Sequence, residues 1–575
     1  MKKILVGALA NFIAMAAISQ VNIFDAATLP ASLRENAHSV KREEKITFEV
    51  KDIDEAKLSV HQVFTVLDAS GDDVLFFNEY SSGFRKLVDA EIKVFDANGK
   101  FVNKYKLKEM HAQNTGEGLV DDGKVYYFRV TAPSYPVTVQ YDSEVKYKGT
   151  LNYPTYYIQE PDQSVEHSTF TATVPLSIDL RFKNKHTDVA SVTNTIGNNK
   201  FYNWEVKNLP PIIYEKGTSR YLANYPHVVI APTKFSMDGK EGDLTSWKNF
   251  GIWCGSLYKD MVSLSDETKN YLRQMVAGAT SDKEKAKIIY TYLQKNFRYV
   301  SIQLGIGGYK PFPASFVNDK KYGDCKALSN YTQACLTAIG ITSYPALINA
   351  YYNGEPVDPA FPSNGFDHVI LCIPGKPDTC WLECTSNSTD FGILGSFTEN
   401  RYALLLTPDG GVLVPTPKSL PSENCFNAST KVILSEDASG ESTSRIRTSG
   451  EYKQDIIHYV NEKKDDQKEY LVSTLGFIQP DIYELTSDKK KDSSEIDFNL
   501  VMDKVPDFTA GSKMFLHPRI YKMWHLKMPD DEKRTMPFYF ECPFIKTDTT
   551  VYQLPENYTV ENLPKARDNK FEYGS

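Results

Sequence analysis

Residues 323–340 read GDCKALSNYTQACLTAIG, and this stretch decides how the centre of the chain folds. Gly323 permits a tight turn, and Asp324 can cap the following helix by accepting a backbone N–H. We expect that helix over residues 326–339, where the glycine that closes the stretch ends it. Cys325 is then in the first helical turn.

The position of Cys325 predicts a candidate nucleophile. A thiol in the first turn lies at the positive end of the helix dipole, and Lys326 adds a cation next to it. Both favour the thiolate, which is the nucleophilic form of cysteine. The alternative is that Cys325 is a small apolar side chain buried at the start of a helix. A nucleophile in this position still needs a base.

His368 is the candidate base. Among the ten histidines it is the one in a strand soon after Cys325, at the head of the run HVILCI over residues 368–373. The apolar character of this run predicts a buried strand. An imidazole at the mouth of such a strand can reach a helix N-terminus and accept a proton there. The alternative is a structural histidine that hydrogen-bonds within the core.

Glu383 is the candidate group that orients the base. After a short hairpin loop the chain returns as TCWLECT over residues 379–385. If the two strands pair with Glu383 directly opposite His368, the two side chains share a face of the sheet. The carboxylate could then hold the imidazole in the tautomer that a base needs. A register one residue away would instead place Cys372 opposite Cys380 and allow a disulfide there.

These three segments resemble the Cys, His and Trp-x-Asp-x-Thr motifs of the transglutaminase-like superfamily, which is related to the papain-type thiol enzymes. The run YVSIQLGIGGY over residues 299–309 resembles a bacterial subgroup of that superfamily. Its exported members join an N-terminal β-rich domain of unknown function, a transglutaminase-like core and a further β-rich domain. The resemblance implies a catalytic triad of Cys325, His368 and Glu383. Glu383 stands where the family usually has Asp, and the two carboxylates have the same charge.

The resemblance also implies acyl transfer on peptide or protein amides. The thiolate attacks the carbonyl carbon, the imidazolium protonates the departing amine, and a thioester forms. Water resolves the thioester in a peptidase or amidase, and an amine resolves it in a transglutaminase. We favour hydrolysis because nothing in the sequence marks an amine site. The Cys325 backbone N–H would hold the oxyanion together with a second donor, for which Gln303 is the candidate; its alternative is a surface glutamine.

The sequence predicts neither a cofactor nor a metal ion. Residues 305–308 are expected to form a glycine-rich loop, which lacks the spacing of a phosphate loop or a dinucleotide fingerprint, and no His, Cys, Asp and Glu cluster has zinc or EF-hand spacing. The rival interpretation of the whole chain is a non-catalytic binding or scaffold protein that uses the same fold. In that case the flanking β-rich domains would recognise a partner, such as a component of the cell envelope.

The N-terminus predicts export. Lys2 and Lys3 precede an apolar run over residues 4–19, which is shorter than the roughly 20 residues of a membrane-spanning helix. Ala17-Ile18-Ser19 has the small-x-small character of a signal-peptidase site, so residues 1–19 are expected to be a cleaved signal peptide. An uncleaved anchor is the alternative. We expect an exported protein, in the periplasm or at the cell surface, without a membrane span in the mature chain.

Length and composition predict several globular domains. A chain of 575 residues is too long for a single core. Period-2 alternation predicts an N-terminal antiparallel β-sandwich-like domain over residues 43–237. Mixed helix and strand patterns predict an α+β transglutaminase-like (papain-like) domain over 243–415. Returning β patterning, with one helix around residues 467–475 and a last strand over 550–563, predicts a C-terminal β-rich domain over 416–575. This domain could be incomplete because no closing strand is evident.

Charge and cysteine content exclude two classes of protein. The net charge is −8, whereas a nucleic-acid-binding protein needs a basic face. Eight cysteines are too few for a disulfide-stapled scaffold of this size. The charge therefore predicts no nucleic-acid partner. The predicted partner is the protein or peptide substrate that the family resemblance implies.

Overall fold

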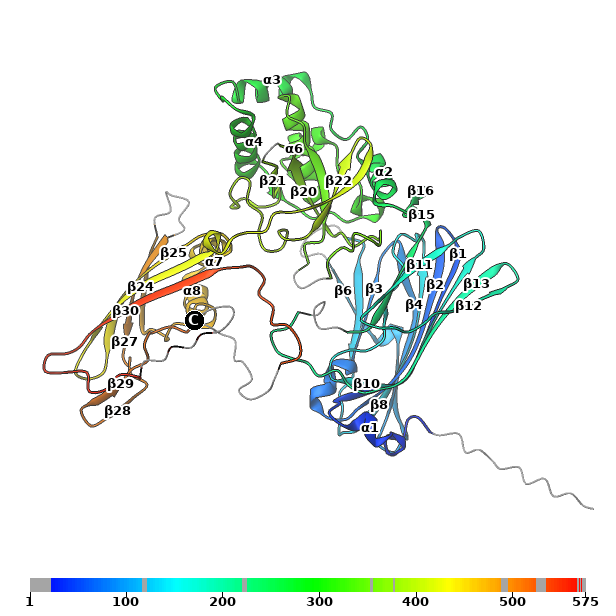
Figure 1. Cartoon of the computed structure of the whole chain (residues 1–575), viewed down its shortest axis with the longest axis horizontal. Coiled ribbons are helices and arrows are strands. Elements are labelled where there is room, and N and C mark those ends of the chain that lie inside the picture. Colours follow the sequence, from blue (N-terminus) through cyan, green and yellow to red (C-terminus); the bar gives the residue numbers. More distant parts are fainter. Residues whose placement is uncertain are drawn as a thin grey trace, which may run out of the picture.

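The structure is a computed structural model that describes residues 22–575 apart from 116–120, 220–224, 352–354, 376–377, 488–494, 524–533, 566–567, 569 and 571–575. The predicted signal peptide lies outside the described residues. Three domains follow one another along the chain. In Figure 1 the central domain, which contains helices and a sheet, is at the top of the view between the two β-rich domains. Among the described residues, none of the helices has the length and apolar character needed to cross a bilayer.

The N-terminal domain is built on an eight-stranded sheet in the order β12-β13-β10-β1-β2-β8-β4-β5. Neighbouring strands pair antiparallel except β1 and β10, which are parallel. The strands are β1 (Ser39–Asp52), β2 (Glu55–Val66), β4 (Arg85–Phe95), β5 (Phe101–Lys106), β8 (Val137–Tyr147), β10 (Gln163–Pro175), β12 (Val192–Ile196) and β13 (Asn199–Leu209).

Two smaller sheets and a short helix complete this domain. One sheet contains β3 (Phe76–Ser81), β7 (Lys124–Arg129) and β6 (His111–Asn114), and the other contains β11 (Leu180–Lys185), β14 (His227–Pro232) and β9 (Tyr156–Tyr157). The helix is α1 (Ala31–Arg34). Phe77 from β3 and Ile230 from β14 pack into the same core as Phe48, Phe170 and Trp204 of the large sheet. The predicted sandwich-like packing of sheets is therefore present.

The central domain packs helices against a five-stranded antiparallel sheet in the order β21-β20-β19-β22-β23. The strands are β19 (Tyr344–Ile348), β20 (His368–Ile373), β21 (Cys380–Leu382), β22 (Tyr402–Thr407) and β23 (Gly410–Pro415). The helices are α2 (Trp247–Tyr258), α3 (Asp266–Met275), α4 (Asp282–Asn296), α5 (Ala314–Lys320) and α6 (Cys325–Ala338). A short parallel pair joins β17 (Arg298–Tyr299) to β18 (Tyr322–Gly323).

Serine caps start three of these helices, since the hydroxyls of Ser246, Ser265 and Ser281 each accept a backbone N–H of the first turn. The sequence pattern assigned residues 305–308 to a loop, but they form a short 3-10 helix. Consecutive glycines leave the backbone free to adopt either conformation, and the sequence pattern does not distinguish the two.

The C-terminal domain has a five-stranded sheet in the order β26-β27-β25-β24-β30, and α7 and α8 pack against it (Figure 1). Its elements are β24 (Cys425–Leu434), β25 (Gly440–Thr448), α7 (Glu451–Asn461), α8 (Lys464–Ser473), β26 (Ile482–Ser487), β27 (Glu495–Met502), β28 (Phe508–Ala510), β29 (Lys513–Phe515) and β30 (Ile545–Gln553). The pattern at 467–475 predicted one helix here, whereas two are present.

The last strand also differs from the sequence expectation, which placed it at residues 550–563. β30 begins at Ile545 and ends at Gln553 because it pairs in parallel with β24 along nearly the whole length of that strand. Its partner, and not its own alternation of polar and apolar residues, sets its ends.

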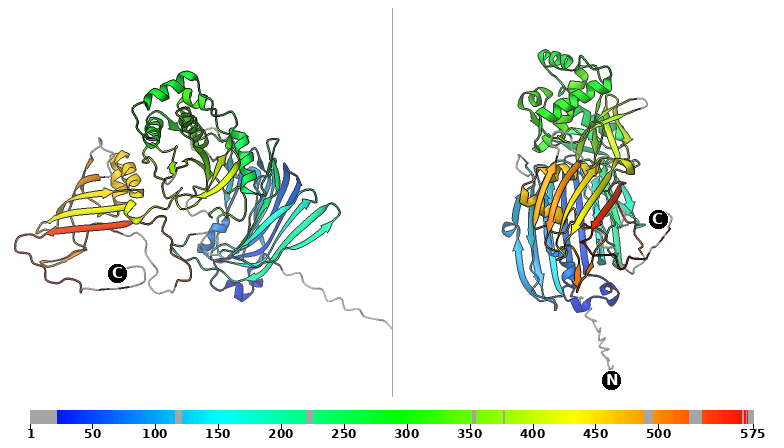
Figure 2. Two further views of the ribbon diagram at one scale, coloured as in Figure 1. Left: turned by 45° about the horizontal axis from the view of Figure 1, so that its top comes forward. Right: turned by 90° about the vertical axis from the view of Figure 1, so that its left-hand side faces the viewer.

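The N-terminal and central domains share one hydrophobic core. The strands β15 (Lys234–Met237) and β16 (Lys240–Asp243) form a hairpin. Phe235 in β15 and Leu244 directly after β16 pack with Trp253 of α2 and Leu404 of β22. α2 approaches the central sheet so closely that a Cβ on Gly251 would lie 2.1 Å from Gly411. Figure 2 shows the arrangement of the central and N-terminal domains in two further views.

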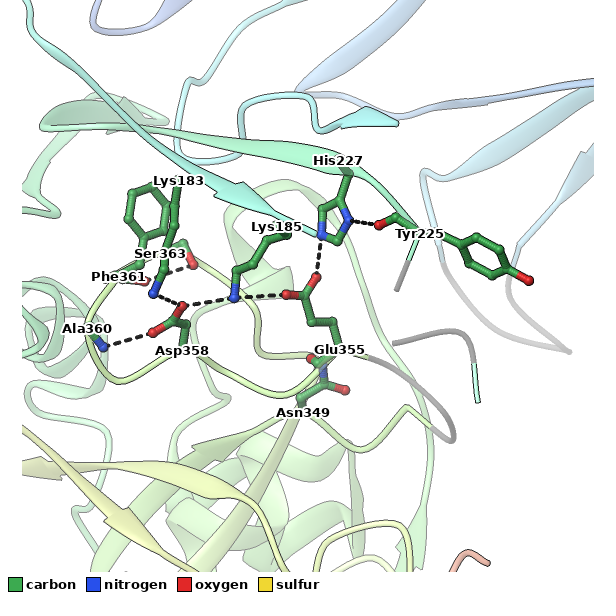
Figure 3. Close-up of polar contacts among 10 residues, drawn as sticks. All are labelled: Lys183, Lys185, Tyr225, His227, Asn349, Glu355, Asp358, Ala360, Phe361 and Ser363. Atoms are coloured by element: carbon green, nitrogen blue, oxygen red, sulfur yellow. Dashed lines mark hydrogen bonds and ion pairs between the residues drawn. The ribbon is translucent and has the colours of Figure 1, made fainter. Parts of the chain in front are cut away.

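An ionic network joins the same two domains at a second place (Figure 3). Lys183 and Lys185 of β11 pair with Asp358 at 2.5 and 2.9 Å, and Asp358 lies in the loop after β19. His227 of β14 lies 2.9 Å from Glu355 in that loop. The hydrogen bonds of Asp358 to both lysines outweigh its burial and lower its pKa to about 2. Together, core and network fix the position of the N-terminal domain relative to the central sheet.

Candidate active site

Cys325 is the first residue of α6, as the sequence predicted. The Asp324 carboxylate caps the helix by accepting the N–H of Ala327 at 3.0 Å. The first N–H groups of a helix have no acceptor within the helix, so those of Cys325 and Lys326 are available to a ligand. The Cys325 side chain is 6% exposed. The thiol therefore lies at a capped, positively polarised helix end, with little access to solvent.

Lys326 follows Cys325 in the first turn of α6. Its ammonium is buried and forms an ion pair with Asp324, the same carboxylate that caps the helix. A buried cation needs an anionic partner, and the cap supplies one. The cation that the sequence predicted beside the thiol is therefore present, but its charge is compensated by Asp324.

His368 begins β20 and contacts both predicted partners. Its Nε2 lies 3.0 Å from Oε2 and 3.2 Å from Oε1 of Glu383. Burial lowers the pKa of His368, but hydrogen bonds to Cys325 and to Glu383 outweigh that effect and raise it to about 10. The imidazole is consequently protonated at neutral pH, between a sulfur and a carboxylate.

Glu383 is fully buried and remains ionised. It accepts hydrogen bonds from the backbone N–H of Thr385 at 3.1 Å and from its hydroxyl at 2.5 Å. Burial raises the pKa of Glu383, but the bonds to His368 and Thr385 more than offset it and the pKa is lowered. The hydroxyl of Tyr290 on α4 donates to the Glu383 carbonyl at 2.8 Å and so fixes the backbone here.

The hairpin register differs from the predicted one by two residues. Cys372 pairs with Trp381 and Ile373 with Cys380, which places Glu383 diagonally across from His368 instead of directly opposite. A shift of two keeps every side chain on its predicted face, so the carboxylate still reaches the imidazole. The alternative disulfide does not form, since Cys372 and Cys380 are not opposite each other and all eight cysteines are free.

A cleft of about 600 Å³ opens at Cys325 and His368, and two domains line it. The central domain contributes Gln303, whose carbonyl accepts the N–H of Asp122 at 3.5 Å from the other wall. The N-terminal domain supplies that wall, through Tyr80, Arg85, Asp121, Asp122, Tyr147 and Asn152. Gln303 thus lies in the cleft, and its role as an oxyanion donor stays a prediction.

Two features of the site have no signal in the sequence. One is the wall from the N-terminal domain, which depends on how two domains pack. The other is Tyr258 at the end of α2, which lines the cleft and whose buried hydroxyl has no hydrogen-bond partner among the described residues. Burial raises the pKa of Tyr258. Over the described ranges, no three His, Cys, Asp or Glu side chains are placed to hold a metal ion.

Comparison with protein families matches all three domains. Residues 269–385 match the family model described as transglutaminase-like superfamily. Residues 55–213 and 512–575 match two families described as domains of unknown function. Among curated proteins, none matches this chain.

Comparison with solved structures supports the fold. A crystal structure named "putative protease" from Parabacteroides distasonis is 12% identical, with a TM-score of 0.50, over 81% of this chain and 94% of that chain. At this identity the likeness shows a shared fold. An M1 zinc metallopeptidase from Deinococcus radiodurans is 9% identical over 42% of this chain and 53% of that one, with a TM-score of 0.19, which carries no argument.

Proposed function

We propose, from the premise that residues 269–385 form a transglutaminase-like domain, that this chain is a thiol acyl-transfer enzyme acting on amide bonds of peptides or proteins. Cys325, His368 and Glu383 are the proposed catalytic residues. The observation that carries the proposal is the position of the His368 imidazole, which lines the same cleft as the helix-terminal thiol of Cys325 and lies 3.0 Å from the buried carboxylate of Glu383.

Each group has a definite task in the proposed reaction. The Cys325 sulfur attacks the amide carbonyl carbon, and the first N–H groups of α6 stabilise the oxyanion that forms. His368 transfers its proton to the departing amine, and a thioester remains on Cys325. Glu383 holds the ring of His368 in one orientation through its contact with Nε2, and its negative charge stabilises the imidazolium. Water then attacks the thioester with His368 as the base. We favour this hydrolysis over transfer to a second amine.

We also propose that the protein works outside the cytoplasm, in the periplasm or at the cell surface. Lys2, Lys3 and the short apolar run that follows support this location, because they have the pattern of a secretory signal. Detection of a mature N-terminus near residue 20 in secreted material would support it, whereas an intact N-terminus in the cytoplasmic fraction would contradict it.

The reactivity of Cys325 tests the catalytic proposal. Iodoacetamide should alkylate Cys325 well below pH 8 and faster than the other cysteines, as followed by peptide mass mapping. Cys384 is a matched control, since it is buried in the same domain and burial raises its pKa to about 12. The His368→Ala variant should lose the selective reaction. Reactivity at Cys325 that does not change in His368→Ala would contradict the proposal and favour a non-catalytic scaffold.

Hydrolysis and transfer are distinguished by product analysis. Peptide substrates incubated with and without a primary amine should give the carboxylic acid in both cases. Products that carry the amine instead of the acid would assign the transferase reaction.

A further inference from the structure

A second cavity, of about 570 Å³, lies inside the N-terminal β domain. One of its walls is a face of the eight-stranded sheet, where side chains alternate with a period of two. Leu58, Val60, Gln62 and Phe64 of β2 line it together with Tyr141 and Ser143 of β8. The opposite wall comes from β3 and from residues 152–163. The two layers of the domain are thus incompletely packed against each other at this place.

Aromatic rings make up much of the apolar part of the cavity wall. The rings of Phe64, Phe76, Phe77, Tyr141, Tyr147 and Tyr153 all line it. Two of the acidic groups on the wall already have partners, since Glu44 pairs with Lys41 at 3.0 Å and Glu79 with Arg85 at 2.5 Å. Because these carboxylates neutralise the charges of Lys41 and Arg85, the cavity suits an uncharged, flat apolar group better than a charged one.

The cavity adjoins the cleft at Cys325. Arg85, Tyr147 and Asn152 line both spaces. The guanidinium of Arg85 donates to the hydroxyl of Tyr147 at 3.2 Å, so this pair forms part of the boundary between the two. A ligand whose reacting group is at Cys325 therefore has only these three side chains to pass before it enters the β domain.

We propose that the N-terminal β domain is the specificity-determining part of the enzyme and that its cavity takes an aromatic side chain of the peptide substrate. This inference rests on the proposed function, because it assumes that a peptide amide is attacked at Cys325. It assigns to the domain a binding role that the chemistry of the triad does not require. A pocket of several hundred Å³ has room for one such side chain and the backbone that carries it.

Alkylation by peptide reagents tests the inference on the full chain. The two probes are chloromethyl ketones of N-acetyl-Phe-Gly and of N-acetyl-Gly-Gly, and the rate of modification of Cys325 is followed by mass spectrometry. We expect the Phe reagent to react at least about tenfold faster. Ser143→Trp fills the cavity and should reduce this preference to about onefold, and Val60→Phe, a milder change at the paired position, should reduce it partly.

Ser59→Trp is the matched control. Ser59 and Ser143 are both half-buried, but Ser59 pairs with Glu144 and therefore lies on the opposite face of the sheet. This variant should keep the full preference for the Phe reagent. Ser59→Trp should also react with iodoacetamide at the wild-type rate, and the circular dichroism spectrum of every variant should match that of the wild type, which shows that the fold is intact.

The outcomes separate the two proposals. Normal iodoacetamide labelling with equal rates for both peptide reagents, or a preference that persists in Ser143→Trp, overturns the cavity and leaves the proposed function in place. Absence of iodoacetamide labelling at Cys325 overturns the function. In that case, saturable binding of N-acetyl-Phe-Gly-amide to the wild-type protein but not to Ser143→Trp would still support the cavity.

Discussion

Replacing Glu383 with Gln removes the carboxylate charge beside His368 and leaves the shape of the side chain nearly unchanged. The Gln amide oxygen can still accept the hydrogen bonds that Thr385 now donates to the carboxylate. The main loss is then electrostatic, because the protonated imidazole no longer has its anion.

The size of the effect follows from the pKa of His368. The pKa rises from the ordinary 6.5 to about 10, which corresponds to about 5 kcal/mol in favour of the imidazolium at 1.36 kcal/mol per unit. Cys325 and Glu383 share this stabilisation. If Glu383 supplies about half of it, Glu383→Gln costs about 2.4 kcal/mol, and alkylation of Cys325 at pH 7 slows by about 60-fold.

Rates of alkylation by iodoacetamide between pH 6 and pH 10 measure this effect. The gap between wild type and Glu383→Gln should close towards pH 10, because an unassisted thiol ionises near pH 8.5. Glu399→Gln is the control: Glu399 is also buried in the central domain, but it bonds to Ser419 and not to His368. Identical pH profiles for wild type and Glu383→Gln would refute the role assigned to Glu383.

Three further changes test the site and the fold. Gln303→Ala should lower turnover of an amide substrate by about 100-fold without slowing alkylation of Cys325; unchanged turnover would instead direct the search for the second donor to Tyr258. Gly251→Ala should destabilise the fold by about 1–3 kcal/mol in urea unfolding, whereas Gly255→Ala in the same helix has open space around its Cβ and should not. Asp358→Asn should cost about 1 kcal/mol above pH 4, after allowance for solvent screening. Because the pKa of Asp358 is lowered, that difference should vanish as the pH falls towards 2; a difference that persists at pH 2 would contradict the assignment.

Local signals in the sequence were sufficient to predict the elements of the site. The capping carboxylate of Asp324 and the apolar run after His368 each specify one element through short-range chemistry, and both elements form as expected. The contact between His368 and Glu383 was predictable because it depends only on which face of a strand each residue occupies.

Long-range packing explains what the sequence did not predict. A register shift of two residues satisfies the same pattern of apolar faces, so the pattern does not distinguish the two registers. The ion pair between Lys326 and Asp324 depends on how deeply α6 is buried. The cleft wall around Asp122 and Asn152 depends on the packing of two domains that are distant in sequence. The helix α7 was missed because its sequence follows directly on the β-type alternation of β25.

The core shared by the N-terminal and central domains has a consequence for how the protein can be divided. The family matches end at residue 213 and resume at 269, yet Phe235, Leu244 and Trp253 of that core lie between them. A fragment cut at the matched ends would expose this apolar surface to water and would be prone to aggregate. Engineered exchange of the N-terminal domain between relatives therefore has to move the intervening segment and the central domain with it. The two domains are then transplanted as one piece and their shared core stays intact.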